Sequence, residues 1–158
     1  MTLTQKFDHA LRAAGGPQTV TAHEPPRSVR CALDEVTSLA VNVGSLVLET
    51  SELATATIHE LEEMSRDLSG RVNYLLEPIG PIEADADTCT VQMRSMPPHK
   101  DDDGRSYYEL LVRRGGELSL RRYRKEPGQP RTAIPATLTR EVLVRLIGDF
   151  GAVLDGMS

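Results

Sequence analysis

The stretch that decides the fold runs from residue 28 to residue 69 and reads SVRCALDEVTSLAVNVGSLVLETSELATATIHELEEMSRDLS. Ser28 follows two prolines and is a good N-cap, because its hydroxyl can accept hydrogen bonds from first-turn amides. From there, apolar residues recur every seven positions in two rows offset by four, which is typical of a helix that packs like a coiled coil. Ten of the twelve positions in the two rows are apolar: Val29, Val36, Val43, Thr50, Thr57 and Met64, then Leu33, Ala40, Val47, Ala54, Leu61 and Leu68.

A third row of leucines widens this apolar stripe in the middle of the predicted helix, so several neighbours are expected to pack on it. Because such a helix is longer than a small sheet, we predict that the stripe is an oligomer seam. The alternative is that the stripe is buried against the sheet of the same chain. The predicted seam residues are Val29, Leu33, Val36, Leu39, Val43, Leu46, Val47, Leu53, Leu61 and Met64.

The residues before this stretch indicate a short helix and a linker. Leu3, Phe7 and Leu11 are four residues apart, which predicts an amphipathic helix over residues 4–14, ended by the Gly15–Gly16–Pro17 sequence. Residues 18–26 show no periodicity and end in two prolines, so we expect an extended linker. The sequence therefore divides into residues 1–27 (short helix and linker), 28–76 (long helix) and 77–158.

The third segment predicts an antiparallel meander of three or four strands. Residues 88–95 alternate apolar and polar, which indicates a strand, and Asp85–Ala86–Asp87 would form the turn from a short strand near residues 81–84. The strongest hairpin signal lies at residues 107–125 around Gly115–Gly116. A three-residue loop with Gly116 in the left-handed conformation places Val112 opposite Leu118 and puts the charged residues on the other face.

A last helix is predicted after Thr139, with an apolar stripe from Val142 to Leu154 and Gly156 just past its end. This helix should cover the apolar face of the sheet. The predicted fold class is therefore α+β, with a long N-terminal amphipathic helix, the meander, and a C-terminal helix packed on the sheet.

Charge is distributed unevenly along the chain. Residues 1–90 carry six basic and fourteen acidic side chains, whereas residues 105–145 carry ten basic and four acidic ones. On the hairpin, cations and tyrosines combine the ingredients of a nucleic-acid platform, although the net charge of −5 opposes a polyanion. The residues expected to contact a polyanion or an acidic partner are Arg121, Arg122, Arg124, Lys125 and Tyr123.

Other chemical motifs fail on residue type or spacing. The four histidines are scattered, so no zinc template fits, and Cys31 and Cys89 are expected to be buried small side chains. The Asp101–Asp103 run lacks the first and last ligands of an EF-hand loop, so a solvated loop is expected. We predict no cofactor, no metal, no membrane helix and no secretory signal, with a cytoplasmic location.

These observations predict a non-enzymatic, homo-oligomeric interaction module, such as an adaptor, an assembly subunit or a chaperone-like protein. Its partners would be further copies of itself and an unidentified protein. A nucleic-acid-binding protein that uses the hairpin at residues 107–125 is one alternative. An enzyme whose site forms at a subunit interface is another.

Overall fold

The structure is a computed structural model, and it describes residues 1–157. Three helices and one large antiparallel sheet make up the chain. The helices are α1 (Leu3–Arg12), α2 (Ile58–Arg71) and α3 (Arg140–Asp155), with a short 3-10 turn η1 (Ser51–Leu53). The strands are β1 (Gln18–Glu24), β2 (Arg27–Val36), β3 (Val41–Thr50), β4 (Ile79–Asp85), β5 (Thr90–Ser95), β6 (His99–Lys100), β7 (Arg105–Arg113), β8 (Glu117–Lys125), β9 (Thr132–Ile134) and β10 (Ala136–Leu138).

The sheet runs in the order β1-β2-β3-β8-β7-β5-β4, so the N-terminal strands join the C-terminal hairpin through the β3–β8 pair. The predicted arrangement, a long helix followed by a meander of three or four strands, is therefore wrong. The predicted linker over residues 18–26 is wrong as well, because most of it is β1. The three expected segments all contribute strands to the same sheet.

The long helix is wrong because two bulged strands imitate helical spacing. In β2 and β3 the pairing shifts on either side of Leu33, leaving Gly44 and Asp34 as extra residues in the ladder. Each bulge lengthens the spacing of buried residues from two to three, as between Val43 and Leu46. Only residues 58–71 of the stretch are helical, and that helix starts with a capping box of Thr57 and Glu60.

Several of the predicted elements are confirmed. Helix α1 has Leu3, Phe7 and Leu11 buried, and α3 begins after the Thr139 N-cap as expected. The hairpin of β7 and β8 has the predicted register, with Val112 opposite Leu118, and Gly116 has a φ of 102°. A Cβ at Gly116 would lie 2.7 Å from the Thr50 carbonyl oxygen, so this position requires glycine for space as well as conformation.

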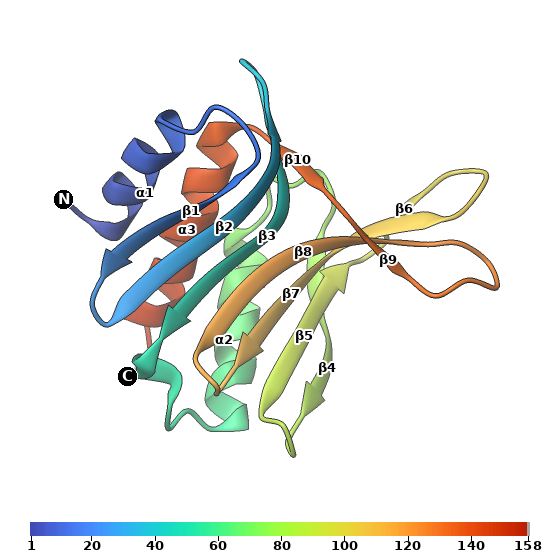
Figure 1. Cartoon of the computed structure of the whole chain (residues 1–158). Coiled ribbons are helices and arrows are strands. Elements are labelled where there is room, and N and C mark those ends of the chain that lie inside the picture. The colour runs from blue at the N-terminus through green and yellow to red at the C-terminus, as the bar shows by residue number, and fades with distance from the viewer. Residues whose placement is uncertain (158) are drawn as a thin grey trace.

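All three helices lie on one side of the sheet, as Figure 1 shows. We call that side the covered face and the other side the open face; among the described residues no helix packs on the open face. The core is formed by α1, α2 and α3 with the side chains that the strands direct to the covered face, including Leu46, Leu48, Leu110, Leu118 and Leu120. At one end of the sheet, β6 with its turn and the β8–β9 loop project past the helices, and we call residues 99–106 and 122–134 the arm.

Candidate functional site

The predicted seam residues lie mostly inside the chain's own core. Leu39 is the exception, because it is 84% exposed in the β2–β3 turn, and Val36 is half-buried. Val47 is buried although its side chain belongs to the open face, opposite Arg30 and Ser119. Because the helix that would align these residues does not exist, the heptad seam is not formed. The other seam residues, all buried in the core, are Val29, Leu33, Val43, Leu46, Leu53, Leu61 and Met64.

Strand alternation divides the predicted basic patch between the two faces of the sheet. Arg121 and Tyr123 lie on the open face with Lys125, whereas Arg122 and Arg124 point to the opposite side. Lys125 donates hydrogen bonds to the backbone carbonyls of Glu126 and Gln129 and is thereby engaged within the chain. The five residues therefore do not form one basic surface.

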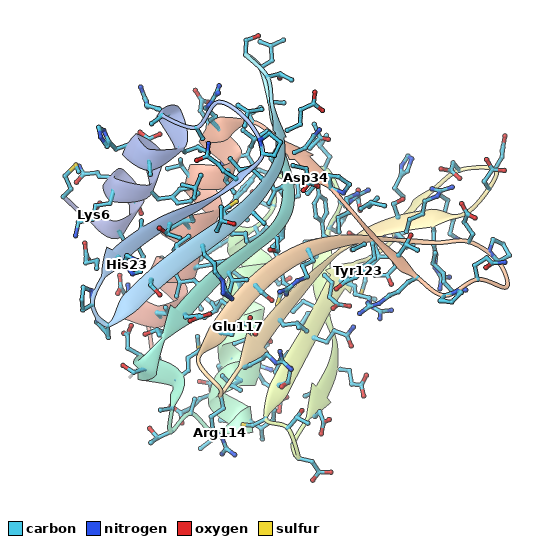
Figure 2. All side chains as sticks on the ribbon, in the orientation of Figure 1. Lys6, His23, Asp34, Arg114, Glu117 and Tyr123 are labelled. Atoms are coloured by element: carbon cyan, nitrogen blue, oxygen red, sulfur yellow. The ribbon has the colours of Figure 1, made fainter. Side chains whose placement is uncertain are left out.

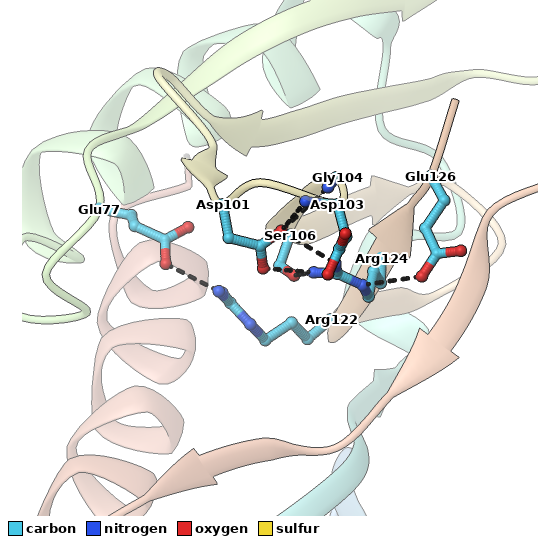
Figure 3. A network of polar contacts seen from close by, with 8 residues as sticks. All are labelled: Glu77, Asp101, Asp103, Gly104, Ser106, Arg122, Arg124 and Glu126. Carbon is cyan, nitrogen blue, oxygen red and sulfur yellow. Dashed lines mark hydrogen bonds and ion pairs between the residues drawn. The ribbon is translucent and has the colours of Figure 1, made fainter.

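Arg122 is paired with an acidic residue from a distant part of the chain. Its Nη2 lies 3.0 Å from a carboxylate oxygen of Glu77 (Figure 3). Its guanidinium also stacks 4.4 Å from the ring centroid of Tyr108. Both charged side chains are mostly buried, at 13% and 16% exposure. Burial raises the pKa of the Tyr108 hydroxyl. This cluster attaches the arm to the segment after α2.

Arg124 is neutralised within the arm itself. It donates two hydrogen bonds to the Asp101 carboxylate, at 2.9 and 3.0 Å, and contacts Glu126 (Figure 3). Asp101 also accepts from the backbone amides of Asp103 and Gly104, closing the β6–β7 turn. These contacts, with the Arg124 hydrogen bond the largest, hold the pKa of Asp101 well below its usual range. As expected, Asp101 to Asp103 form an exposed turn.

The open face carries an ordered group of polar and aromatic side chains that we call the arginine–tyrosine cluster: Arg94, Tyr107, Glu109, Tyr123 and Arg131. The Arg131 guanidinium lies 3.8 Å from the ring centroid of Tyr123, and the Arg94 guanidinium lies 4.9 Å from that of Tyr107. The two tyrosine rings are 6.1 Å apart, centroid to centroid. Such stacks keep long cationic side chains in fixed positions.

Glu109 is the centre of this cluster and is only 4% exposed. Its carboxylate accepts a 2.6 Å hydrogen bond from Arg131 and a 2.7 Å hydrogen bond from Gln92, while Arg94 is 3.7 Å away. The hydrogen bond with Glu109 is the main cause that raises the pKa of Arg131. Glu109 therefore pairs most closely with Arg131, whereas Arg94 is farther from the same carboxylate and Arg121 has no ion pair among the described residues.

The open face has an apolar centre within a polar surround. Val47 and Leu111 flank Ser119 in one row across β3, β8 and β7, and Val47 is 2% exposed. Figure 2 views this face and labels Glu117 and Tyr123 on β8 and His23 on β1. The alternation of the sequence placed Gln92 and Arg94 on the polar side of their strand. It did not show that this side continues the polar face of the hairpin.

One row on the open face has residue types used in nucleophilic catalysis. His23, Ser28 and Glu49 lie side by side across β1, β2 and β3. A nucleophile–base pair requires a hydrogen bond between serine and histidine, and among the described residues none joins these three; Glu49 instead pairs with Arg30 at 2.9 Å. The geometry offers no assembled triad.

Neither of the two cysteines provides a reactive thiol at the open face. Cys31 and Cys89 are free and buried, as expected. Burial raises the pKa of the Cys31 thiol to about 12, so it stays protonated at neutral pH. Within residues 1–157, no three His, Cys, Asp or Glu side chains are grouped where they could hold a metal ion.

Two hollows open on this surface. One, of about 810 Å³, lies at the hairpin end among Ser28, Thr50, Thr90, Arg113 and Gly116. The other, of about 500 Å³, lies beside the arginine–tyrosine cluster where β5 meets Pro97 and Pro98. The open face therefore has a polar hollow at the hairpin end and, beside the arginine–tyrosine cluster, a hollow with an arginine side and an apolar side.

No protein-family model matches this chain, and no match was found among curated proteins or among solved structures. None of the helices in the described part of the chain combines the length and apolar composition needed to cross a membrane.

Proposed function

We propose that this protein is a non-catalytic interaction module that binds a partner protein across the open face of its sheet. The observation that carries the proposal is the placement of all three helices on one side, with an organised arginine–tyrosine cluster on the other. Arginine and tyrosine, together with tryptophan, are enriched at binding hot spots, and side chains whose positions are already fixed lose less freedom on binding.

The layout of the open face supports this proposal. Leu111, which is half-buried, supplies an apolar group at the centre beside the buried Val47, and Arg30, Arg121 and Glu49 supply a polar surround. Interfaces that form and dissociate commonly combine an apolar centre with a polar rim. A sheet face that contacts only solvent requires neither stacked guanidiniums nor a buried carboxylate such as Glu109.

The predicted homo-oligomer cannot form through the heptad stripe, because most residues of that stripe are buried in the core of the chain. Self-association stays a prediction, and the open face is the surface that we propose for it. The nucleic-acid prediction receives less support from the geometry, since Arg122 and Arg124 each have a carboxylate partner and point away from Arg121.

The test compares matched charge reversals on the two sides of the molecule. Arg121→Glu alters the open face, where the Arg121 side chain bonds, among the described residues, only to Ser119, and Arg66→Glu alters the exposed surface of α2. Each variant, tagged in the cells that produce it, is used to capture its partner, and light scattering of the pure protein reports self-association. We expect Arg121→Glu to lose the partner and Arg66→Glu to retain it. Equal retention by both variants, or a captured nucleic acid without protein, would overturn the proposal.

A further inference from the structure

We infer that the hollow beside the arginine–tyrosine cluster binds an acidic residue that adjoins an apolar residue in an extended segment of the partner. The hollow has a volume of about 500 Å³, within the range of sites that hold a few side chains. Its lining includes Arg94, Met96, Pro97, Pro98, Arg105 and Tyr107. This inference rests on the proposed function and names the chemistry of the segment that the open face would recognise.

Two guanidiniums at this hollow have unused hydrogen-bonding capacity. The Arg105 side chain makes no hydrogen bond or ion pair among the described residues and is exposed. Arg94 reaches Glu109 only at 3.7 Å, and its Nε is buried without a hydrogen-bond partner. Arg131 and Gln92 both donate to the same Glu109 oxygen, Oε2, at 2.6 and 2.7 Å, and Arg94 lies at the longer distance from that oxygen.

An incoming carboxylate can be reached by the exposed guanidinium of Arg105 and by the accessible part of the Arg94 side chain, which is 35% exposed. Guanidinium groups bind carboxylates through paired hydrogen bonds. Tyr107 holds the Arg94 guanidinium by stacking, so little side-chain freedom remains to be lost on binding. Arg94 and Arg105 are therefore positioned to bind an anionic group the size of one amino-acid side chain.

The other wall of the hollow is apolar. Met96 is 51% exposed, and its Sδ lies only 3.2 Å from the point where a Cβ at Gly80 would be, so the side chain lies across that glycine. Pro97 and Pro98 continue the same wall. A methionine is adaptable in shape and accepts varied apolar groups. The apolar wall beside two cations matches an acidic residue next to an apolar one.

A long polyanion fits the same place less well. The turn that follows β6 holds Asp101, Asp102 and Asp103 directly before Arg105, and all three are exposed. Nucleic-acid binding depends on many cations along the phosphate path, and these carboxylates interrupt it. A short acidic and apolar segment needs only the two arginines and the wall.

The test uses defined probes and the full chain. NMR spectroscopy follows the side-chain N–H signals of Arg94 and Arg105 and the Met96 methyl signal during titration with a capped peptide of alternating glutamate and leucine. The same peptide with lysine for glutamate, and an oligothymidine, are the comparison probes. We expect the glutamate peptide to move all three signals, with an affinity that falls as salt is added.

Arg105→Glu should weaken binding of the glutamate peptide at least about tenfold, since it reverses one of two charges that contact the ligand. The variant should fold, because Arg105 is exposed and unpaired among the described residues, and circular dichroism checks this. Arg66→Glu is the matched control and should leave the affinity unchanged. Binding unaffected by Arg105→Glu, equal binding of the lysine peptide, or no movement of the three signals would overturn the inference. Movement of the same signals mainly by oligothymidine would overturn it in favour of a polyanion site.

The outcome separates the inference from the function on which it rests. If partner capture still depends on Arg121 but the peptide does not bind the hollow, the inference is wrong and the proposed function stands. If capture does not depend on Arg121, the proposed function fails whatever the peptide does.

Discussion

Leu120 and Arg121 are neighbours on β8, yet Leu120 is fully buried beneath the helices while Arg121 lies half-exposed on the open face. On the covered face, stability comes from close-packed aliphatic side chains, where removing a few methylene groups leaves a cavity. On the open face, order comes from stacked arginines and from one buried carboxylate. The comparison indicates that the covered face specifies the fold, and the open face is the surface that we propose for binding.

The largest expected difference between the faces comes from truncating this neighbouring pair. Leu120→Ala should lower the free energy of unfolding by about 2–5 kcal/mol, because its side chain is fully buried. Arg121→Ala should change it by less than about 0.5 kcal/mol, as expected for a surface position. Urea unfolding measures both. Similar losses for the two variants would contradict the division of roles.

The end of the hairpin, which joins the two halves of the sheet, should be the next most sensitive place. Gly116→Ala should cost about 1–3 kcal/mol, because the φ of 102° is strained for alanine and its Cβ would meet the Thr50 carbonyl oxygen. Gly115→Ala is the matched control, since a Cβ there has no neighbour within 4 Å. Thermal unfolding of both variants measures whether glycine is required at position 116 but not at position 115.

Glu109 tests whether the order of the open face depends on its buried carboxylate. Glu109→Gln should destabilise the protein by about 1–2 kcal/mol, because Arg131 loses a charged partner at 2.6 Å that is largely buried. Glu49→Gln removes an exposed ion pair with Arg30 on the same face and should cost less than about 1 kcal/mol. If the two substitutions lower the free energy of unfolding equally, Glu109 contributes no more to stability than an exposed charged residue on the same face.

The smallest effect concerns the arm and depends on pH. The pKa of Asp101 is lowered in the folded state, mainly by the hydrogen bond from Arg124, so its stabilising contribution is present above the unfolded pKa of about 3.9 and is lost as the pH falls below it. The difference in free energy of unfolding between wild type and Asp101→Asn should therefore shrink between about pH 5 and pH 2. Asp102→Asn, which removes no ion pair among the described residues, should show no such change.

The sequence predicted an element correctly where the spacing of its residues directly indicated how that element pairs or packs. The hairpin register followed from Gly116 and from the opposition of Val112 and Leu118, and α3 followed from an uninterrupted apolar stripe. In β2 and β3 the bulges at Asp34 and Gly44 gave buried residues a spacing of three, which a helix also produces. The capping box at Thr57 and Glu60 was the local signal that would have separated α2 from the strands.

The candidate site was less predictable because its members come from separate strands. Arg121 and Glu109 were correctly placed opposite each other, but the hydrogen bonds to Glu109 come from Arg131 and Gln92. The pairing of β5 with β7 brings Arg94 beside this carboxylate, and strand order was not deducible from alternation. Arg122 similarly meets Glu77, in the segment between α2 and β4, because its side chain lies on the side of β8 opposite Arg121.

Site-specific photo-cross-linking tests most directly whether the open face is the binding surface. A photo-reactive amino acid is introduced at position 121, and in a separate variant at position 66 on α2, and each protein is irradiated in the cells that produce it. If the open face is the binding surface, position 121 gives a protein adduct and position 66 gives none. An adduct from position 66 alone, or an adduct at position 121 that contains only nucleic acid, would contradict this role of the open face.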